Sequence, residues 1–178
     1  MKTICNNNNC TGCSACVNIC PEQALSLKQD ENGFFKPYLD KDKCIDCNLC
    51  ENTCPLNGIK SENYTEPKLY VFNNFSSEAK LSATAGGFQI IAKDFIQNGG
   101  KVVGAAWGEN WRCKHVIVDN LNDLKKLYKS KYLQSYLGDV FKRIKIELDK
   151  GIKILFSGLP CQIAGLRAYL KKDYENLF

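Results

Sequence analysis

The sequence contains very little histidine, a single residue at His115, and no long apolar run. One histidine gives no indication of a serine, histidine and aspartate set for nucleophilic catalysis, and we interpret His115 as structural. No segment approaches the roughly 20 consecutive apolar residues that a membrane helix needs. The start, MKTICNNNNC, has no apolar stretch of signal-peptide length. We therefore expect a cytoplasmic protein with no membrane span.

Cysteine, in contrast, is abundant: the chain has eleven, and nine of them lie in the first 54 residues. An odd total in a chain expected to be cytoplasmic favours metal binding over a disulfide framework. Eight cysteines form two copies of the spacing C-x2-C-x2-C-x3-C-P, and each residue recurs 34 positions later. The first copy has Cys10, Cys13, Cys16 and Cys20, and the second has Cys44, Cys47, Cys50 and Cys54.

This repeated spacing is typical of two [4Fe–4S] clusters, because each iron needs a soft, anionic thiolate. Three cysteines on one tight loop reach three corners of a cluster, and the fourth is carried away to ligate the other cluster. We therefore assign Cys10, Cys13, Cys16 and Cys54 to the first cluster. Cys44, Cys47, Cys50 and Cys20 are assigned to the second.

Zinc is the alternative, but it needs only four thiolates and favours paired C-x2-C knuckles. Cys5 lies outside the repeat, and we interpret it as an exposed or core thiol rather than a ligand. Asp46 stands inside the second loop, where its negative charge is expected to lower the potential of the second cluster.

The order of predicted elements gives an α+β, ferredoxin-like N-terminal domain followed by an α/β domain. We place the first domain at residues 1–60, a linker at 61–68 and the second domain at 69–178. Asn32-Gly33 predicts a hairpin within residues 30–40. Strands are expected at 69–75, 101–107, 115–118 and 152–156, and helices at 88–97, from Asn120 or Asn122 to 128, at 139–150 and from 159 to 171. The apolar pair that closes the chain, Leu177 and Phe178, suggests the start of another strand, so we expect that the second domain is incomplete.

Three local features of the second half are candidate sites. Gly86 and Gly87 precede a helix, where free N–H groups favour a phosphate, although helix-packing glycines are as common. Ser130, Lys131 and Tyr132 follow a helix and either contact an anion or form a solvated turn. Cys161 and Gln162 open a helix after a buried strand, where ligands bind in α/β sheets. Cys161 is either reactive there or a buried structural residue.

Four segments occur in an order that resembles the coenzyme F-420 hydrogenase/dehydrogenase beta-subunit family, in its bacterial branch with an N-terminal dicluster ferredoxin domain. They are ATAGG at 83–87, GGKVVGAAW at 99–107, KSKYLQS at 129–135 and LFSGLPCQIAGLRAYL at 155–170. The resemblance implies an iron–sulfur flavoprotein that binds FAD. Gly86 and Gly87 would then lie near the flavin phosphate, and Ser130, Lys131 and Tyr132 would line the cofactor region with Gln162.

On the same resemblance, Cys161 is a cluster ligand or a flavin neighbour. The family continues with a further cysteine-bearing segment that is absent here, so a third [4Fe–4S] cluster is expected only in a longer chain. The expected function is an oxidoreductase that passes electrons between two clusters, a flavin and an unidentified substrate or coenzyme. Two alternatives are a non-catalytic ferredoxin-type electron carrier with a docking domain, and a protein whose clusters are purely structural.

The charge pattern bears on partners. Residues 1–60 hold six lysines and seven acidic residues, whereas residues 61–178 hold eighteen Lys and Arg and twelve acidic residues. The basic excess has no accompanying aromatic RNA signature, so a nucleic-acid partner is not expected. We expect a redox partner protein, for which a positive surface suits an acidic partner, or a reduced coenzyme.

Overall fold

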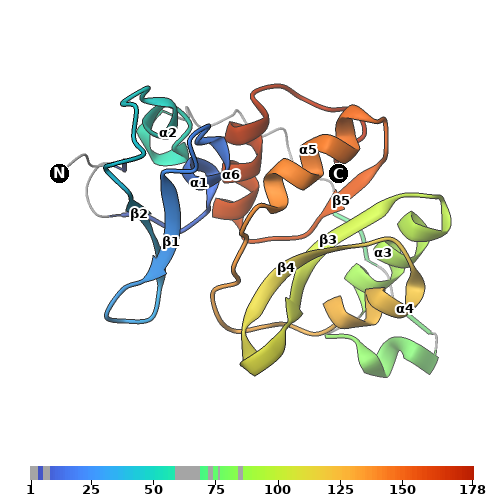
Figure 1. Ribbon diagram of the computed structural model, residues 1–178. Coiled ribbons are helices and arrows are strands. Elements are labelled where there is room, and N and C mark those ends of the chain that lie inside the picture. Colours follow the sequence, from blue (N-terminus) through green and yellow to red (C-terminus); the bar gives the residue numbers. More distant parts are fainter. Residues whose placement is uncertain (1–3, 6–8, 59–68, 72–73, 76, 84–85) are drawn as a thin grey trace.

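The computed structural model describes residues 4–5, 9–58, 69–71, 74–75, 77–83 and 86–178. It is a mixed α and β structure with two small sheets, one in each half of the chain. Figure 1 shows the N-terminal half, with α1, α2 and the β1–β2 hairpin, lying beside the second half and its three-stranded sheet.

The N-terminal half is built on an antiparallel hairpin of β1 (Leu25–Gln29) and β2 (Phe35–Leu39). The turn is closed by Asp30, whose carboxylate accepts hydrogen bonds from the backbone N–H groups of Asn32 and Phe34 at 3.0 and 2.9 Å. Gly33 has a φ of 82°, which glycine adopts without steric cost. The hairpin predicted from Asn32-Gly33 is confirmed. The helices of this half are α1 (Ala15–Ile19), α2 (Leu49–Asn52) and the 3-10 turn η2 (Pro55–Asn57).

The second half centres on β3 (Lys101–Trp107), which pairs antiparallel with β4 (Cys113–Val118) and parallel with β5 (Ile154–Phe156). Helices cover both faces of this sheet. They are α3 (Gly87–Gln97), α4 (Leu121–Leu124), α5 (Val140–Asp149) and α6 (Pro160–Leu170), with short 3-10 turns at η3 (Ser77–Leu81), η4 (Glu109–Trp111) and η5 (Lys125–Leu127).

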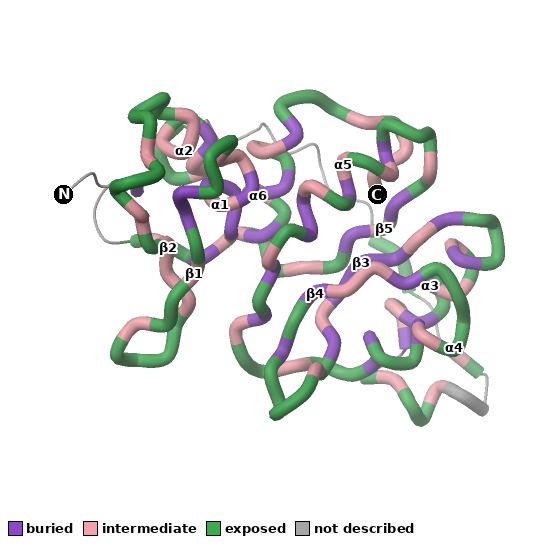
Figure 2. Tube along the Cα trace, viewed as in Figure 1, coloured by how far each residue is buried: buried purple, intermediate pink, exposed green. Residues whose placement is uncertain are grey.

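The two faces of β3 belong to separate hydrophobic cores, because successive strand residues point to opposite sides. Val102 packs with Ala92 of α3 and Leu124 of α4. Its neighbour Val103 packs with Phe141 of α5 and with Leu166 of α6. Figure 2 shows the buried stretches concentrated along β3, β5 and the helices that cover them.

The two halves are in direct contact. Ala15 of α1 is fully buried in the same core as Val103. Asn18 donates from its side-chain amide to the carbonyl of Gly138 at 2.9 Å, and the N–H of Phe35 donates to Gln134 Oε1 at 2.6 Å. The predicted linker at 61–68 falls outside the described residues.

Most predicted elements of the second half are present, with two main differences. The strand expected at 69–75 is wrong for the described residues 69–71 and 74–75, which belong to no strand. Leu69, Tyr70, Val71 and Phe75 are exposed, whereas the Asn74 side chain is partly buried and donates from Nδ2 to Gln89 Oε1 at 3.1 Å. The helix expected to run to 128 is α4 followed by η5, and Asn120 caps it by accepting from the N–H of Asp123 at 2.9 Å. Leu177, where the sequence suggests the start of another strand, forms an isolated parallel β-bridge with Ile154.

Candidate functional site

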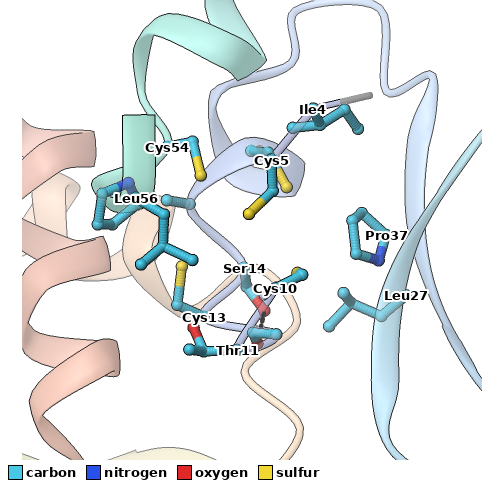
Figure 3. Close-up of a pocket in the computed structure, with 14 residues that line it drawn as sticks. Ile4, Cys5, Cys10, Thr11, Cys13, Ser14, Leu27, Pro37, Cys54 and Leu56 are labelled. Carbon is cyan, nitrogen blue, oxygen red and sulfur yellow. Dashed lines mark hydrogen bonds between the residues drawn. The ribbon is translucent and has the colours of Figure 1, made fainter. Parts of the chain in front are cut away.

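The first group of cysteines lines a cavity between α1, η2 and the hairpin. Its apolar walls include Ile4, Leu27 and Pro37. Figure 3 shows the labelled cysteine side chains gathered around this space. The cysteines that line it are Cys5, Cys10, Cys13, Cys16 and Cys54.

The second group lines a separate cavity beside α2, with Leu25, Leu39 and Leu49 among its apolar walls. Its cysteines are Cys20, Cys44, Cys47 and Cys50. The structure thus brings together the two groups of four that the spacing predicts, with Cys5 as a fifth cysteine in the first cavity. The exchange between copies arises because Cys20 follows the end of α1 and Cys54 precedes η2, so each lies beyond its own loop.

The two cysteine loops share an unusual backbone. Gly12 and Ser14 have φ values of 69° and 67°, and the residues 34 positions later, Asp46 and Asn48, have values of 52° and 59°. Left-handed residues at alternate positions curl a loop tightly enough to turn three cysteines inward. Gly12 is also sterically required, because a Cβ there would lie 2.5 Å from the carbonyl oxygen of Phe35.

Burial in the first cavity disfavours the charged thiolate form of its cysteines. Desolvation raises the pKa of Cys13 to about 11, partly opposed by a hydrogen bond from the backbone of Ala15. Desolvation also raises the pKa of Cys16 far above its usual value. Thiolates in this cavity would therefore need a bound cation to stay deprotonated. In the described part of the chain, no three or more His, Cys, Asp or Glu side chains lie so that they could hold one metal ion.

Helix α6 meets the first cavity at its edge. Gly165 lies against Cys13, and a Cβ at Gly165 would be 3.0 Å from both the Cβ and the Sγ of Cys13. Cys161 lies one helical turn earlier on the same face, close enough to contribute to the raised pKa of Cys13. Cys161 thus faces the first cysteine group from the second half.

A third cavity, of about 320 Å³, opens on the other side of α6, over the middle of β3 and the C-terminal end of β5. This volume is at the small end of the range for ligand pockets, roughly 300–1,000 Å³. Polar and basic side chains converge on it, together with Leu127 and Phe88. The polar and basic residues are Ser82, His115, Lys129, Ser130, Lys131, Ser135, Ser157 and Gln162.

A chain of hydrogen bonds fixes one wall of the third cavity. Gln162 Nε2 donates to Ser135 Oγ at 3.0 Å, and Ser135 Oγ lies 2.9 Å from His115 Nδ1. His115 Nε2 lies 3.2 Å from the carbonyl oxygen of Ser157. Since a carbonyl only accepts, Nε2 carries the proton and Nδ1 accepts from Ser135. Burial lowers the pKa of His115 to about 4, so the imidazole is neutral near pH 7.

Gln162 has a second role, because its Oε1 accepts from the N–H of Leu159 at 2.8 Å and so caps α6. The sequence-based interpretation of His115 as structural agrees with its fully hydrogen-bonded ring, but it missed that this ring lines a cavity. Ser135 and Ser157 were also missed as lining residues. The segments around both were singled out, and for Ser157 the available signal was its position directly after a buried strand.

The residues predicted for a cofactor in the second half are only partly brought together. Ser130, Lys131 and Gln162 line the third cavity. Tyr132 is 95% exposed and borders a different groove, between the β1–β2 hairpin and β4. Cys161 faces the cysteines instead.

Gly86 and Gly87 do not line the third cavity. The lining residues that flank them in the sequence are Ala83 and Phe88. Gly86 has a φ of 74° and no room for a side chain, since a Cβ would lie 2.8 Å from Nδ2 of Asn74. Gly87 is the first residue of α3. Both positions fit the alternative in which the glycines pack the start of this helix.

Comparisons with known proteins agree with the cysteine arrangement. Residues 9–57 match the family of 4Fe-4S dicluster domains. The chain is also similar to an oxidoreductase. The relative is the coenzyme F420-dependent sulfite reductase of Methanocaldococcus jannaschii, at 28% identity over 171 residues. The match covers 94% of this chain and 26% of the relative, so the chain spans about a quarter of that protein's length.

Together these similarities support [4Fe–4S] clusters and an electron-transfer role. No helix within the described residues is long and apolar enough to cross a membrane.

Proposed function

We propose that this chain is the electron-transfer part of an iron–sulfur flavoprotein, in which two clusters exchange electrons with a flavin held in the third cavity. The N-terminal half would act as a bacterial-type ferredoxin. Cys10, Cys13, Cys16 and Cys54 would hold the first cluster, and Cys20, Cys44, Cys47 and Cys50 the second. Four thiolates around each apolar cavity are the donor set that a [4Fe–4S] cluster requires.

The single observation that carries the proposal is the position of α6. One face of this helix contacts Cys13 through Gly165, and its first turn contributes Gln162 to the third cavity. A redox group in that cavity would therefore be separated from the first cluster by little more than one helix. A domain that only docked a partner protein would not need a cavity this close to the first cysteine group.

The two cysteine groups differ in exposure, so one end of the proposed electron path lies at the surface and the other lies inside the chain. Cys47 is exposed, and its neighbour Ile45 is 62% exposed. Cys16 is buried. The second cluster would thus face a redox partner protein or a reduced coenzyme at the surface, and the first would face the interior of the chain.

The third cavity has side chains suited to an anionic, planar cofactor such as FAD. Lys131 supplies a positive charge, although its Nζ already donates to the carbonyl of Tyr128 at 2.6 Å. Ser130 supplies a hydroxyl, and the neutral His115 leaves that wall uncharged. When bound, a flavin supplies the coupling between one-electron and two-electron steps that clusters alone do not provide.

A flavin titration of the anaerobically reconstituted chain tests the proposal. FAD should bind one per chain, with quenching of its fluorescence. Lys131→Ala should weaken binding about tenfold or more, as expected for a lost hydrogen bond to a charged group, worth about 1.5–3 kcal/mol. The matched control, Lys125→Ala, removes an equal charge from a residue outside the cavity lining and should leave the affinity unchanged.

Failure of FAD to bind the intact chain would favour a second candidate, a ferredoxin-type carrier without catalysis. The match of residues 9–57 to a dicluster domain supports electron transfer in either case. Equal weakening in both lysine variants would show a general charge effect and would contradict a site in the third cavity.

A further inference from the structure

The first cavity contains one more cysteine than a cluster needs. Cys5 lines it together with the four expected ligands, and its residue is only 6% exposed. Figure 3 shows the Cys5 side chain directed into the same space as those of Cys54, Cys10 and Cys13. The second cavity, among the described residues, is lined by four cysteines. The sequence-based interpretation of Cys5 as a thiol that is not a ligand therefore has to be reconsidered.

Two contacts hold Cys5 over the cavity. Ile4 is 8% exposed and packs in a small core with Cys16 and Leu25. Asn57, in the turn that follows Cys54, donates from Nδ2 to the carbonyl oxygen of Ile4 at 2.8 Å. The same turn thus positions both Cys54 and the backbone that carries Cys5.

The internal repeat shows what is unusual about this position. An offset of 34 residues relates Cys5 to Leu39, and Leu39 lines the second cavity as Cys5 lines the first. The second copy therefore has an apolar side chain where the first has a thiol. Covering the cavity does not require a thiol, since leucine covers the equivalent cavity.

We propose that Cys5 is a reserve ligand of the first cluster, able to replace Cys54. This inference rests on the proposed function, because it requires that a cluster occupies the first cavity. In the exchange, the Cys5 thiol releases its proton and its sulfur forms a bond to the iron that Cys54 held. The bond from Cys54 breaks, and the Cys54 thiolate takes up a proton. No electron is gained or lost, so no oxidant or reductant is needed.

The test compares two cysteines that the repeat makes equivalent, Cys54 and Cys20, in the full chain reconstituted anaerobically with ferrous iron and sulfide. Alanine replaces each, because a serine oxygen would offer a substitute ligand. The wild-type chain should hold about eight irons, four per cluster. Cys54→Ala should keep about eight irons, whereas Cys20→Ala should keep about four of them, held by the first cysteine group.

A double variant, Cys54→Ala with Cys5→Leu, copies the second cavity's lining into the first and should keep about four irons. Electron paramagnetic resonance of the reduced samples should show two interacting clusters in Cys54→Ala and one isolated cluster in the double variant. The four irons of the second cluster report on folding in both of these variants.

Loss of the first cluster in Cys54→Ala would overturn the inference, whether or not the second cluster is also lost. Retention of about eight irons in the double variant would also overturn it, because another group would then be the fourth ligand. A wild-type chain that binds no cluster would instead contradict the proposed function itself.

Discussion

Asp46 offers a quantitative test of how the protein tunes its second cluster. Its carboxylate oxygen lies 3.8 Å from the sulfur of Cys44, and the residue is exposed in the loop between Cys44 and Cys47. Reduction adds a negative charge to a cluster, so a nearby carboxylate disfavours it. Asp46→Asn should therefore raise the potential of the second cluster.

The magnitude follows from the distance and the exposure. Two unit charges about 4 Å apart interact by about 1 kcal/mol in water. For a one-electron couple, this corresponds to about 40 mV, since roughly 59 mV accompanies a tenfold change in the equilibrium constant. The added electron is spread over a whole cluster, and salt screens an exposed charge, so we expect a rise of about 20–40 mV at low ionic strength that shrinks in about 1 M salt.

An anaerobic redox titration followed by electron paramagnetic resonance measures both clusters in one sample. The first cluster should keep its potential in Asp46→Asn, and Glu31→Gln, which removes a charge from the hairpin turn, should leave both unchanged. A second-cluster potential that is unchanged or lowered in Asp46→Asn would refute the reasoning. A rise of equal size in Glu31→Gln would refute it as well.

Two further predictions concern α6 and the third cavity. Gly165→Ala should alter the spectrum and potential of the first cluster without changing the second, because its Cβ would lie 3.0 Å from Cys13 Sγ. Gly58→Ala is the control, because its Cβ would meet nothing within 4 Å. Identical first-cluster spectra in wild type and Gly165→Ala would contradict the contact. His115 has a pKa of about 4 in the folded chain, below the ordinary 6.5, so only the unfolded state takes up a proton between these values and stability falls as the pH is lowered through this window. From pH 7 to pH 5 the loss should be about 2 kcal/mol in wild type and absent in His115→Gln, measured by urea unfolding; equal losses in both would place the pH dependence elsewhere.

Local patterns in the sequence carried much of the fold. Asn32-Gly33 predicted the hairpin, and apolar residues at helical spacing within 88–97 predicted α3, because in each case the nearest neighbours along the chain decide the conformation. The strand predicted at 69–75 failed for the opposite reason. An apolar run becomes a strand only where another strand offers hydrogen bonds. The edge of β5 that faces away from β3 pairs with Leu177 instead.

The cysteine cavities were predictable because the repeat fixes both spacing and partner. The cofactor region of the second half was not, since contacts across the chain decide it. Nothing in the sequence around Cys161 indicates that it faces Cys13 rather than the third cavity, and nothing near Tyr132 indicates that it borders another groove. Cys5 was dismissed for lying outside the motif, yet the 34-residue offset that links it to Leu39 was available in the sequence.

The central claim is that the chain holds two [4Fe–4S] clusters in two separate cysteine cavities. Analysis of iron, zinc and acid-labile sulfide per chain after anaerobic purification tests it most directly. The account predicts about eight irons and eight sulfides, with a spectrum from two magnetically interacting clusters after reduction. About one or two zinc ions per chain, with no labile sulfide, would contradict it, because zinc sites use four thiolates and no sulfide.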